Sequence, residues 1–231
     1  MQIHGLNKTT LLDYPEHVAA TVFTGGCNFC CPFCHNGDLV LRAKEYPTIS
    51  EEEVLAFLQK RKNILSGVCI TGGEPTLQPD LQEFIRKIKE MGYLVKLDTN
   101  GYRPEVLRAL LEENLLDYVA MDIKNCKEKY DTTVGVERLD IKRIEESVSI
   151  LLEGKIPYEF RTTVVRELHT PEDFEAIGAW IQGARACFLQ SYRDNDNVIQ
   201  KGYSAYSKEE LEVFVKVLQK YVKRVELRGV E

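Results

Sequence analysis

Four of the seven cysteines of this chain lie within one short stretch, residues 24–36, which reads TGGCNFCCPFCHN. Three of them, Cys27, Cys31 and Cys34, have the spacing C-x3-C-x2-C. A loop with this spacing can turn three thiolates toward one cuboidal iron-sulfur cluster, because thiolate is the soft ligand that such clusters require. The fourth iron would then have no protein ligand, and an open coordination position is where a metal centre can do chemistry.

The same cysteines allow other interpretations. They form two overlapping C-x2-C pairs, Cys27 with Cys30 and Cys31 with Cys34. Structural zinc sites usually separate their pairs by about 12 to 20 residues, whereas these pairs abut, so zinc is disfavoured. A disulfide is disfavoured because cysteines clustered in one tight loop favour a metal over a cross-link. Spacing alone leaves the register open, since Cys27, Cys30 and Cys34 make C-x2-C-x3-C and could also hold a cluster.

Length and composition place limits on the fold and the partners. The chain has 231 residues, enough for one α/β domain, and we expect a single domain over residues 1–231. Its 30 basic and 36 acidic residues are interspersed and give a net charge of −6, so nucleic acid is not an expected partner. The first residues do not resemble a signal peptide, and no run of about 18 apolar residues occurs. We therefore expect a soluble, cytoplasmic protein without a membrane partner.

Short apolar, β-rich runs alternate with amphipathic segments along the chain. The expected strands cover residues 17–23, 67–71, 93–97, 118–123, 158–165 and 186–190, with a further edge strand at 222–228. The expected helices begin at Ser50, as a capping box predicts, and then cover residues 81–91, 104–113, 141–152, 171–181 and 208–222. The polar segment 125–138 is expected to be a long irregular loop.

This alternation predicts a parallel sheet covered by helices, either an open doubly wound sheet or a barrel. Unusual polar residues follow the expected strands, at 27–34, 72–74, 98–100, 122–124 and 190–192. In parallel β/α architectures, active sites form at the carboxyl ends of the strands. We therefore expect these segments to form the site.

The cysteine loop resembles the motif of the radical S-adenosylmethionine (SAM) superfamily, with Phe33 as the aromatic residue of C-x-aromatic-C. This resemblance selects Cys31 over Cys30. It implies a [4Fe-4S] cluster held by Cys27, Cys31 and Cys34, SAM as a second cofactor, and an α/β fold of the partial (β/α)6 barrel type.

The glycine pair after the expected strand 67–71 also fits this resemblance. In the family, a Gly-Gly-Glu motif grips the amino group of the methionine part of SAM, and here the motif is Gly72, Gly73 and Glu74. Glycines let the backbone approach a ligand closely, and a carboxylate can accept hydrogen bonds from an ammonium group. Without the cysteine loop, the same residues would more often be an ordinary turn.

Two acidic strand ends resemble the subfamily that activates glycyl-radical enzymes, in particular the pyruvate formate-lyase activator. The resemblance implies that Asp98, Thr99 and Asp122 hold a monovalent cation beside SAM, and that Lys124 and Asn100 belong to the SAM site. Hard oxygen ligands suit such a cation. Alternatively, the two acids are solvated strand ends and Lys124 pairs with one of them.

Other residues carry weaker signals. Arg161 lies inside an apolar strand and needs a partner, which is either the anionic part of SAM or an acid in a structural ion pair. His35 follows the last motif cysteine and is a candidate neighbour of the cluster. Cys69 is interpreted as a small buried hydrophobe. No role is assigned to Cys126 or His169.

Residues 5–40 most closely resemble the activating proteins of anaerobic ribonucleoside-triphosphate reductase. The resemblance implies that SAM is cleaved to a 5′-deoxyadenosyl radical, which installs a glycyl radical on that reductase. Flavodoxin or ferredoxin would supply the electron. The cofactors carry this chemistry, so no side chain is expected to act as a catalytic acid or base.

Three other functions stay open: an activator of the pyruvate formate-lyase type, a small-molecule enzyme such as a 7-carboxy-7-deazaguanine synthase, and a metal-binding redox or interaction protein without catalysis. Within the activator interpretation, the segment 125–138 is expected to face the protein partner, because long loops in compact domains are usually functional or disordered.

Overall fold

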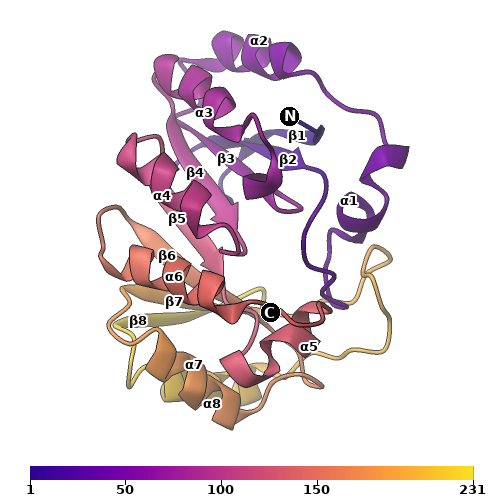
Figure 1. Cartoon of the computed structure of the whole chain (residues 1–231), viewed down its shortest axis with the longest axis vertical. Coiled ribbons are helices and arrows are strands. Elements are labelled where there is room, and N and C mark those ends of the chain that lie inside the picture. The colour runs from indigo at the N-terminus through magenta and orange to yellow at the C-terminus, as the bar shows by residue number, and fades with distance from the viewer. Residues whose placement is uncertain (231) are drawn as a thin grey trace. The chain divides into compact units, whose positions relative to one another are not determined.

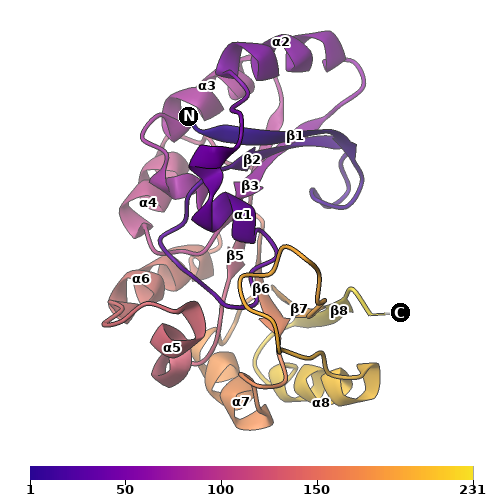
Figure 2. The same cartoon turned by 90° about the vertical axis from the view of Figure 1, so that its right-hand side faces the viewer.

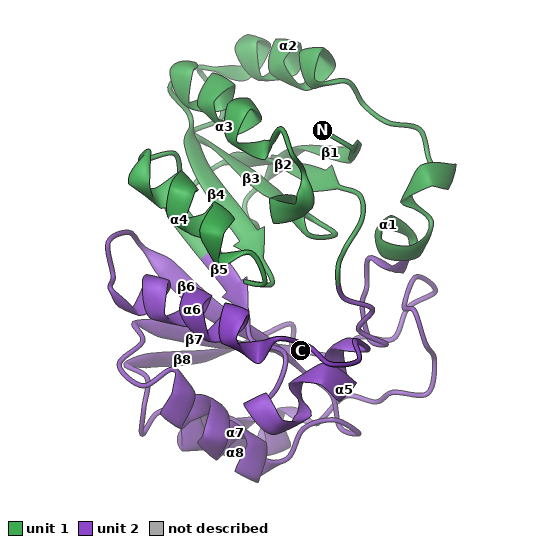
Figure 3. Ribbon diagram, in the orientation of Figure 1, with its two compact units in different colours: residues 1–28, 38–119 green, residues 29–37, 120–231 purple. Residues whose placement is uncertain are grey.

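The computed structural model describes residues 1–230. The chain separates into two compact units, shown in different colours in Figure 3. Unit 1 contains residues 1–28 and 38–119, and unit 2 contains residues 29–37 and the chain from residue 120 onward. Neither unit is a continuous stretch of sequence, and the expected single domain stays a prediction. No helix in the described part of the chain is long and apolar enough to cross a membrane.

The sheet of unit 1 contains four strands: β1 (Ile3–Thr10), β2 (Ala19–Thr24), β3 (Gly67–Gly72) and β4 (Leu94–Thr99). Strands β2, β3 and β4 are parallel, as predicted, and each begins within two residues of the expected position. The sequence analysis missed β1, which pairs antiparallel with β2 (Figure 2). Most β1 residues are partly or fully exposed, so the strand has no apolar pattern and depends on its pairing with β2.

The helices of unit 1 are α1 (Gly37–Leu41), α2 (Glu51–Arg61), α3 (Leu81–Glu90) and α4 (Pro104–Glu112). The Ser50 hydroxyl accepts the Glu53 N–H at 3.1 Å, which confirms the predicted start of α2. Helix α3 buries Leu81, Phe84, Ile85 and Ile88 and runs beside β4 (Figure 1). Gly92 ends this helical segment with a φ of 88°.

Strand β5 (Tyr118–Asp122) contains the boundary between the units, since Val119 belongs to unit 1 and Ala120 to unit 2. Unit 2 then adds the parallel strands β6 (Tyr158–Val164), β7 (Ala186–Ser191) and β8 (Arg224–Arg228). All three lie within two residues of the predicted runs. Its longer helices are α6 (Ile141–Leu152), α7 (Pro171–Trp180) and α8 (Lys208–Leu218), of which α7 and α8 lie side by side (Figures 1 and 2).

The prediction of an irregular loop over residues 125–138 is wrong. The segment contains a 3-10 turn, Lys127–Lys129, followed by the short helix α5 (Tyr130–Val134). Tyr130 and Val134 are both fully buried, and Gly135 ends the helix in the left-handed conformation at φ 65°. The polar composition concealed these two anchors, which lie four residues apart on one side of a single helical turn.

An ion pair on β6 and β8 generates a testable prediction about stability. Glu159 is 1% exposed, and its two carboxylate oxygens accept bonds of 2.7 and 2.9 Å from Arg228. Removing Arg228 leaves this carboxylate without its bidentate partner, so Arg228→Ala should lower the free energy of unfolding by about 2 kcal/mol. Urea unfolding of the variant measures the loss.

The control for this prediction is Arg224→Ala on the same strand. Arg224 is 63% exposed and pairs with Glu226, which is 48% exposed, so its loss should cost less than about 1 kcal/mol. Equal losses in the two variants would show that the buried pair has no special weight.

Candidate functional site

In unit 1 the turn after β3 lies directly against the turn after β2. Gly73 N–H donates to the Thr24 carbonyl at 2.8 Å, and Glu74 N–H donates to the Gly26 carbonyl at 2.8 Å. A Cβ on Gly73 would stand 2.0 Å from the Gly26 oxygen, and one on Gly72, whose φ is 118°, would stand 2.4 Å from Thr24. The glycine pair was expected to admit a ligand. In the structure it admits the backbone at the start of the cysteine loop.

Glu74 is 1% exposed, and four donors surround its carboxylate. Oε1 accepts from Thr76 N at 3.1 Å, Thr76 Oγ1 at 2.6 Å and Thr99 Oγ1 at 2.8 Å. Oε2 accepts from Asn100 N at 2.7 Å. Burial raises the pKa of Glu74, and these hydrogen bonds oppose the rise. The carboxylate thus joins the end of β3 to the end of β4.

Asn100 connects the end of β4 to the first motif cysteine. Its Nδ2 lies 3.8 Å from Cys27 Sγ and donates to Asn28 Oδ1 at 2.9 Å. The amide nitrogen of Asn28 is buried and has no hydrogen-bond partner. A buried donor without a partner beside a thiol fits a site that binds a further acceptor.

Asp98 is not a solvated strand end, as one alternative proposed. It forms an ion pair with Lys96, whose side chain is 2% exposed and which the sequence analysis overlooked. Cys69 contacts both charges, with its sulfur 3.7 Å from Lys96 Nζ and 3.8 Å from Asp98 Oδ1. Cys69 is fully buried, as expected, but it is a member of a polar cluster rather than only a hydrophobe.

In unit 2 the central group is a carboxylate between two cations. Asp122 Oδ2 lies 2.9 Å from Lys124 Nζ, and Asp122 Oδ1 lies 2.9 Å from Arg161 Nε. Burial by itself would raise the pKa of Asp122, but Arg161 and Lys124 outweigh it and lower the pKa to about 2. Lys124 therefore pairs with a strand-end acid, and Arg161 forms an ion pair with the same acid, while a contact of either residue with SAM stays a prediction.

Two motif cysteines belong to the same group. Cys31 is 5% exposed, and Cys34 N–H donates to the Cys31 carbonyl at 3.0 Å. Burial raises the pKa of the Cys31 thiol to about 12, while the positive charge of Lys124 opposes the rise. Burial raises the pKa of Cys34 as well, again against Lys124. A cation beside these thiols favours their thiolate form.

The backbone of Cys30 is held differently. Its N–H donates to the Val134 carbonyl at the end of α5, at 2.9 Å. A Cβ on Gly135 would stand only 2.7 Å from the Cys30 carbonyl oxygen, so the two backbones are in close contact. Phe33, the expected aromatic residue of the motif, is 3% exposed. The backbone of Cys30 is thus anchored to a helix, and Cys34 interacts electrostatically with both Cys30 and Cys31.

The donor set fits an iron-sulfur cluster in ligand chemistry. All seven cysteines are free, so no disulfide competes for the motif thiols. Among residues 1–230, no three side chains of His, Cys, Asp or Glu form a group that could hold a single metal ion. The fit to a cluster therefore rests on thiol type, on the burial of Cys31 and on the neighbouring lysine, with no cluster geometry implied.

The segment after β7, residues 192–200, bonds to residues 32–37 within unit 2. Gln200 N–H donates to the Pro32 carbonyl at 2.8 Å, and Gly37 N–H donates to the Asn197 carbonyl at 3.1 Å. His35 makes an edge-on ring contact with Tyr192 at 5.8 Å. Burial and the charges of Lys124 and Arg193 lower the pKa of His35. A contact of His35 with a cluster stays a prediction.

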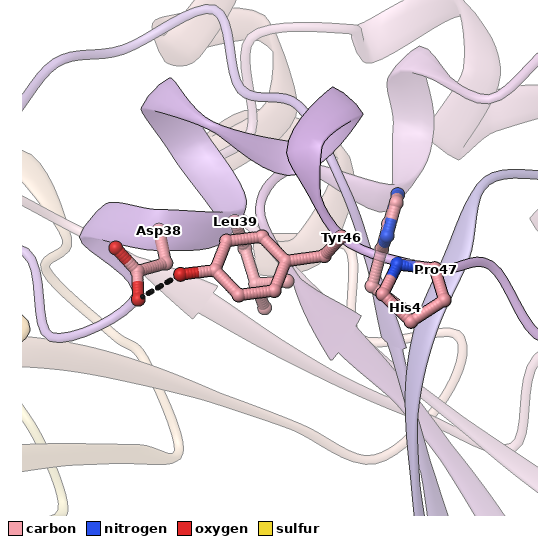
Figure 4. A pocket seen from close by; sticks show the side chains of 5 residues that line it. All are labelled: His4, Asp38, Leu39, Tyr46 and Pro47. Atoms are coloured by element: carbon pink, nitrogen blue, oxygen red, sulfur yellow. Dashed lines mark hydrogen bonds between the residues drawn. The ribbon is translucent and has the colours of Figure 1, made fainter.

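One pocket of about 200 Å³ lies in unit 1 (Figure 4). It is lined by His4, Asp38, Leu39, Tyr46 and Pro47. The Tyr46 hydroxyl donates to Asp38 Oδ2 at 2.9 Å, and both ring nitrogens of His4 are buried without a partner. None of these residues was predicted to belong to a site.

Comparison with known sequences identifies relatives of this chain. The Radical SAM superfamily matches residues 21–181. A Methanocaldococcus jannaschii protein, named as a candidate glycyl-radical enzyme activating enzyme, is 32% identical over 99% of this chain and 96% of its own length. A Thermococcus kodakarensis protein, named as a candidate GTP 3′,8-cyclase, is 32% identical over 67% of this chain. The match covers 50% of the length of that protein.

Solved structures show the fold. Streptococcus suis SuiB, bound to its precursor peptide SuiA, has a TM-score of 0.71 at 13% identity over 90% of this chain and 48% of its own. A domain of a pyruvate-formate lyase-activating enzyme from Bacteroides vulgatus has a TM-score of 0.58 at 18% identity over 71% of this chain and 99% of its own. These likenesses confirm the predicted fold class, an α/β fold with parallel strands in an open partial barrel.

The carboxylate of Asp122 should make stability depend on acid pH. Its folded pKa of about 2 lies below the unfolded value of about 4, so its stabilisation is present above pH 4 and is lost as the pH falls toward 2. Asp122→Asn should remove about 2 kcal/mol at pH 7 and flatten the pH dependence between 4 and 2. Urea unfolding of the cluster-free protein across this range measures both effects.

The control for the acid-stability prediction is Asp194→Asn. Asp194 is 53% exposed and pairs with Lys201, which is 55% exposed, so both the stability and its pH profile should stay as in the wild type. A profile for Asp122→Asn that follows the wild type down to pH 2 would contradict the assigned charge pairing.

Proposed function

Because this chain belongs to the radical SAM superfamily, and is therefore a radical SAM enzyme, we propose that it activates a glycyl-radical enzyme. The proposed partner is an anaerobic ribonucleoside-triphosphate reductase. The observation that carries the proposal is the 32% identity to a candidate activating enzyme over 99% of this chain and 96% of that protein. Similarity over the full length of both chains supports a shared type of substrate more strongly than a shared fold does.

Cys27, Cys31 and Cys34 are proposed to hold a [4Fe-4S] cluster, with Phe33 packed within the same loop. When bound and reduced, the cluster supplies the electron that splits SAM into methionine and a 5′-deoxyadenosyl radical. Lys124 supports this ligand set, because its positive charge lowers the pKa of the Cys31 and Cys34 thiols against the effect of burial. The lysine thus favours the deprotonated thiols that iron requires.

Glu74 is proposed to receive the ammonium group of SAM, within the turn that contains Gly72 and Gly73. A carboxylate has about four acceptor positions, two on each oxygen. In the structure Oε1 already accepts three bonds and Oε2 accepts one, from Asn100 N. Oε1 thus already exceeds its two positions, whereas Oε2 has one position left. An ammonium donor at Oε2 would also offset the effect of burial on the carboxylate.

Lys124 and Arg161 are proposed to receive the carboxylate of SAM. Both cations already share Asp122, at 2.9 Å each, so their charges are held in place before a ligand arrives. The Lys124 ammonium has three donors, of which one is used by Asp122. The group is therefore suited to bind one more anion.

The monovalent cation at Asp98, Thr99 and Asp122 remains a prediction. Such a cation would compete with Lys96 for Asp98, and with two further cations for Asp122. The electron donor, flavodoxin or ferredoxin, is likewise proposed from the family resemblance alone.

A small-molecule radical SAM enzyme is the second candidate. It is favoured by the 32% identity to a candidate GTP 3′,8-cyclase, although the chain spans only 50% of that protein. The two candidates differ in the target of the radical, which is a glycine of a protein in one case and a purine nucleotide in the other.

The test of the proposed function is a search for the glycyl radical. The reduced, reconstituted enzyme is incubated anaerobically with SAM and a candidate anaerobic reductase. Electron paramagnetic resonance should then detect a glycyl radical on the reductase, and chromatography should detect 5′-deoxyadenosine. The matched control is the reductase with its radical-bearing glycine replaced by alanine, which should carry no radical.

Formation of 5′-deoxyadenosine without a radical on the reductase would count against this partner. Conversion of GTP under the same conditions would transfer the proposal to the small-molecule candidate.

The cluster ligands give a separate prediction about Cys30. Its backbone is fixed to α5, and the family resemblance selects Cys31, whose thiol pKa Lys124 lowers against the effect of burial. Cys30→Ser should therefore keep a full complement of iron after anaerobic reconstitution, while Cys31→Ser should lose most of it. Iron and sulfide analysis measures the difference, and the reverse result would reassign the ligand.

A further inference from the structure

Two buried side chains hold the backbone of Lys124 from opposite sides of the residue. Lys124 N–H donates to the Tyr130 hydroxyl at 3.2 Å. The Lys124 carbonyl lies 2.8 Å from His169 Nε2. Both side chains are fully buried, at 0% exposure, so water cannot replace either bond at low cost.

The Tyr130 hydroxyl has a second function in the same segment. It donates to the Asp122 carbonyl at 3.3 Å, so one oxygen bonds both residues of the Asp122–Lys124 ion pair. The ring is fixed by edge-on contacts with Phe29 at 6.4 Å and Trp180 at 6.0 Å. A hydroxyl on an immobilised ring defines the path of the backbone that it bonds.

His169 can donate to Lys124 only as one tautomer, and its surroundings select that tautomer. Nδ1 lies 3.1 Å from the Val165 N–H and 3.2 Å from the Val165 carbonyl, so it could accept or donate. Nε2 faces the Lys124 carbonyl, an acceptor, at 2.8 Å, which favours the proton on Nε2 and leaves Nδ1 to accept from Val165. Burial lowers the pKa of His169, so the ring stays neutral. The sequence alone gives no sign that His169 has this role, because the contact with Lys124 is visible only in the folded structure.

The helix that carries Tyr130 also contacts the cysteine loop. Tyr130 begins α5 and Val134 ends it, and the Val134 carbonyl accepts the Cys30 N–H at 2.9 Å. Gly135 follows in the left-handed conformation, where a side chain would press on the Cys30 carbonyl at 2.7 Å. One helix of five residues therefore contacts the Lys124 segment at one end and the cysteine loop at the other.

We propose that Tyr130 and His169 are positioning residues, here called the Lys124 clamp, which fix the Lys124 ammonium for binding the anionic part of SAM. The clamp rests on the proposed role of Lys124 in the SAM site. Neither residue touches the cofactor itself. Lys124 sits on an irregular segment after β5, and a long side chain on an unfixed backbone would lose part of its binding energy to conformational entropy.

Tyr130→Phe removes only the hydroxyl and tests the clamp. The dissociation constant for SAM should rise by about five- to tenfold, because two backbone groups beside Lys124 lose their partner. Iron content after reconstitution should stay unchanged, since the Val134 bond to Cys30 does not involve the hydroxyl. Isothermal titration measures SAM binding, and the melting temperature reports any general loss of structure.

The matched control is Tyr93→Phe in unit 1. The Tyr93 hydroxyl is also buried and donates to a backbone carbonyl, that of Leu58, at 2.7 Å. Its loss should lower the melting temperature by a similar amount and leave SAM affinity within about twofold of the wild type. An equal loss of affinity in both variants would show that Tyr130 acts through stability alone, which overturns the clamp.

A second variant, His169→Asn, tests the other side of the clamp and serves if Tyr130→Phe does not fold. It should also weaken SAM binding by about fivefold, and His169→Gln, whose longer amide can still reach the carbonyl, should restore part of it. Because both bonds hold one residue, the double variant should lose less than the product of the two single effects.

The outcomes separate the clamp from the proposed function. Wild-type affinity in Tyr130→Phe and His169→Asn, with an active wild-type enzyme, would reject the clamp and leave the function standing. A reconstituted wild-type protein that neither binds nor cleaves SAM would reject both.

Discussion

The need to pair buried charge shapes the polar part of this structure. Asp122 is tolerated at the end of β5 because Lys124 and Arg161 each contact one of its oxygens at 2.9 Å. Removing Asp122 would take the shared carboxylate from two partly buried cations, which costs more than the loss of a surface pair. The triad carries a net positive charge, and the charge of Lys124 opposes the rise that burial causes in the pKa of the Cys31 and Cys34 thiols.

Unit 1 meets the same requirement with hydrogen bonds as well as charges. Glu74 is surrounded by four donors, and Lys96 neutralises Asp98. Both arrangements need chain segments to approach closely, and this is possible because Gly73 has no side chain to separate the turn after β3 from Gly26. Close packing of the backbone at this edge of unit 1 thus makes the pairing of the buried carboxylates possible.

Much of this organisation could be predicted from the sequence. Short apolar runs located β2 to β8 within about two residues, because burial of a parallel strand leaves a clear compositional signal. The position of the site at the strand ends follows from the same rule. The family resemblance then identified residues that the structure places together within each unit, such as Glu74 with Asn100 and Asp122 with Lys124.

The residues that escaped prediction share a physical cause. Strand β1 is an exposed edge, α5 is shorter than two helical turns, and Lys96 is a charged residue in a buried strand. His169 is buried beside Lys124 by a long-range fold contact. β1, α5 and His169 depend on partners elsewhere in the chain, which local periodicity cannot reveal. Lys96 is buried by the sheet around it, although its ion-pair partner Asp98 is only two residues away. The segment around Gln200, which bonds to Pro32, likewise depends on a partner distant in sequence.

The contact of Gln200 with Pro32 has a consequence for how the protein is made. Residues 29–37 belong to unit 2, so they reach their folded surroundings only after residues 120 onward have been synthesised. The bond from Gln200 N–H to the Pro32 carbonyl forms later still. Synthesis proceeds from the amino terminus, and contacts between distant segments form late. The cysteines therefore leave the ribosome long before their cover exists, and during that interval oxidants and stray metals compete for them without any protection from the fold.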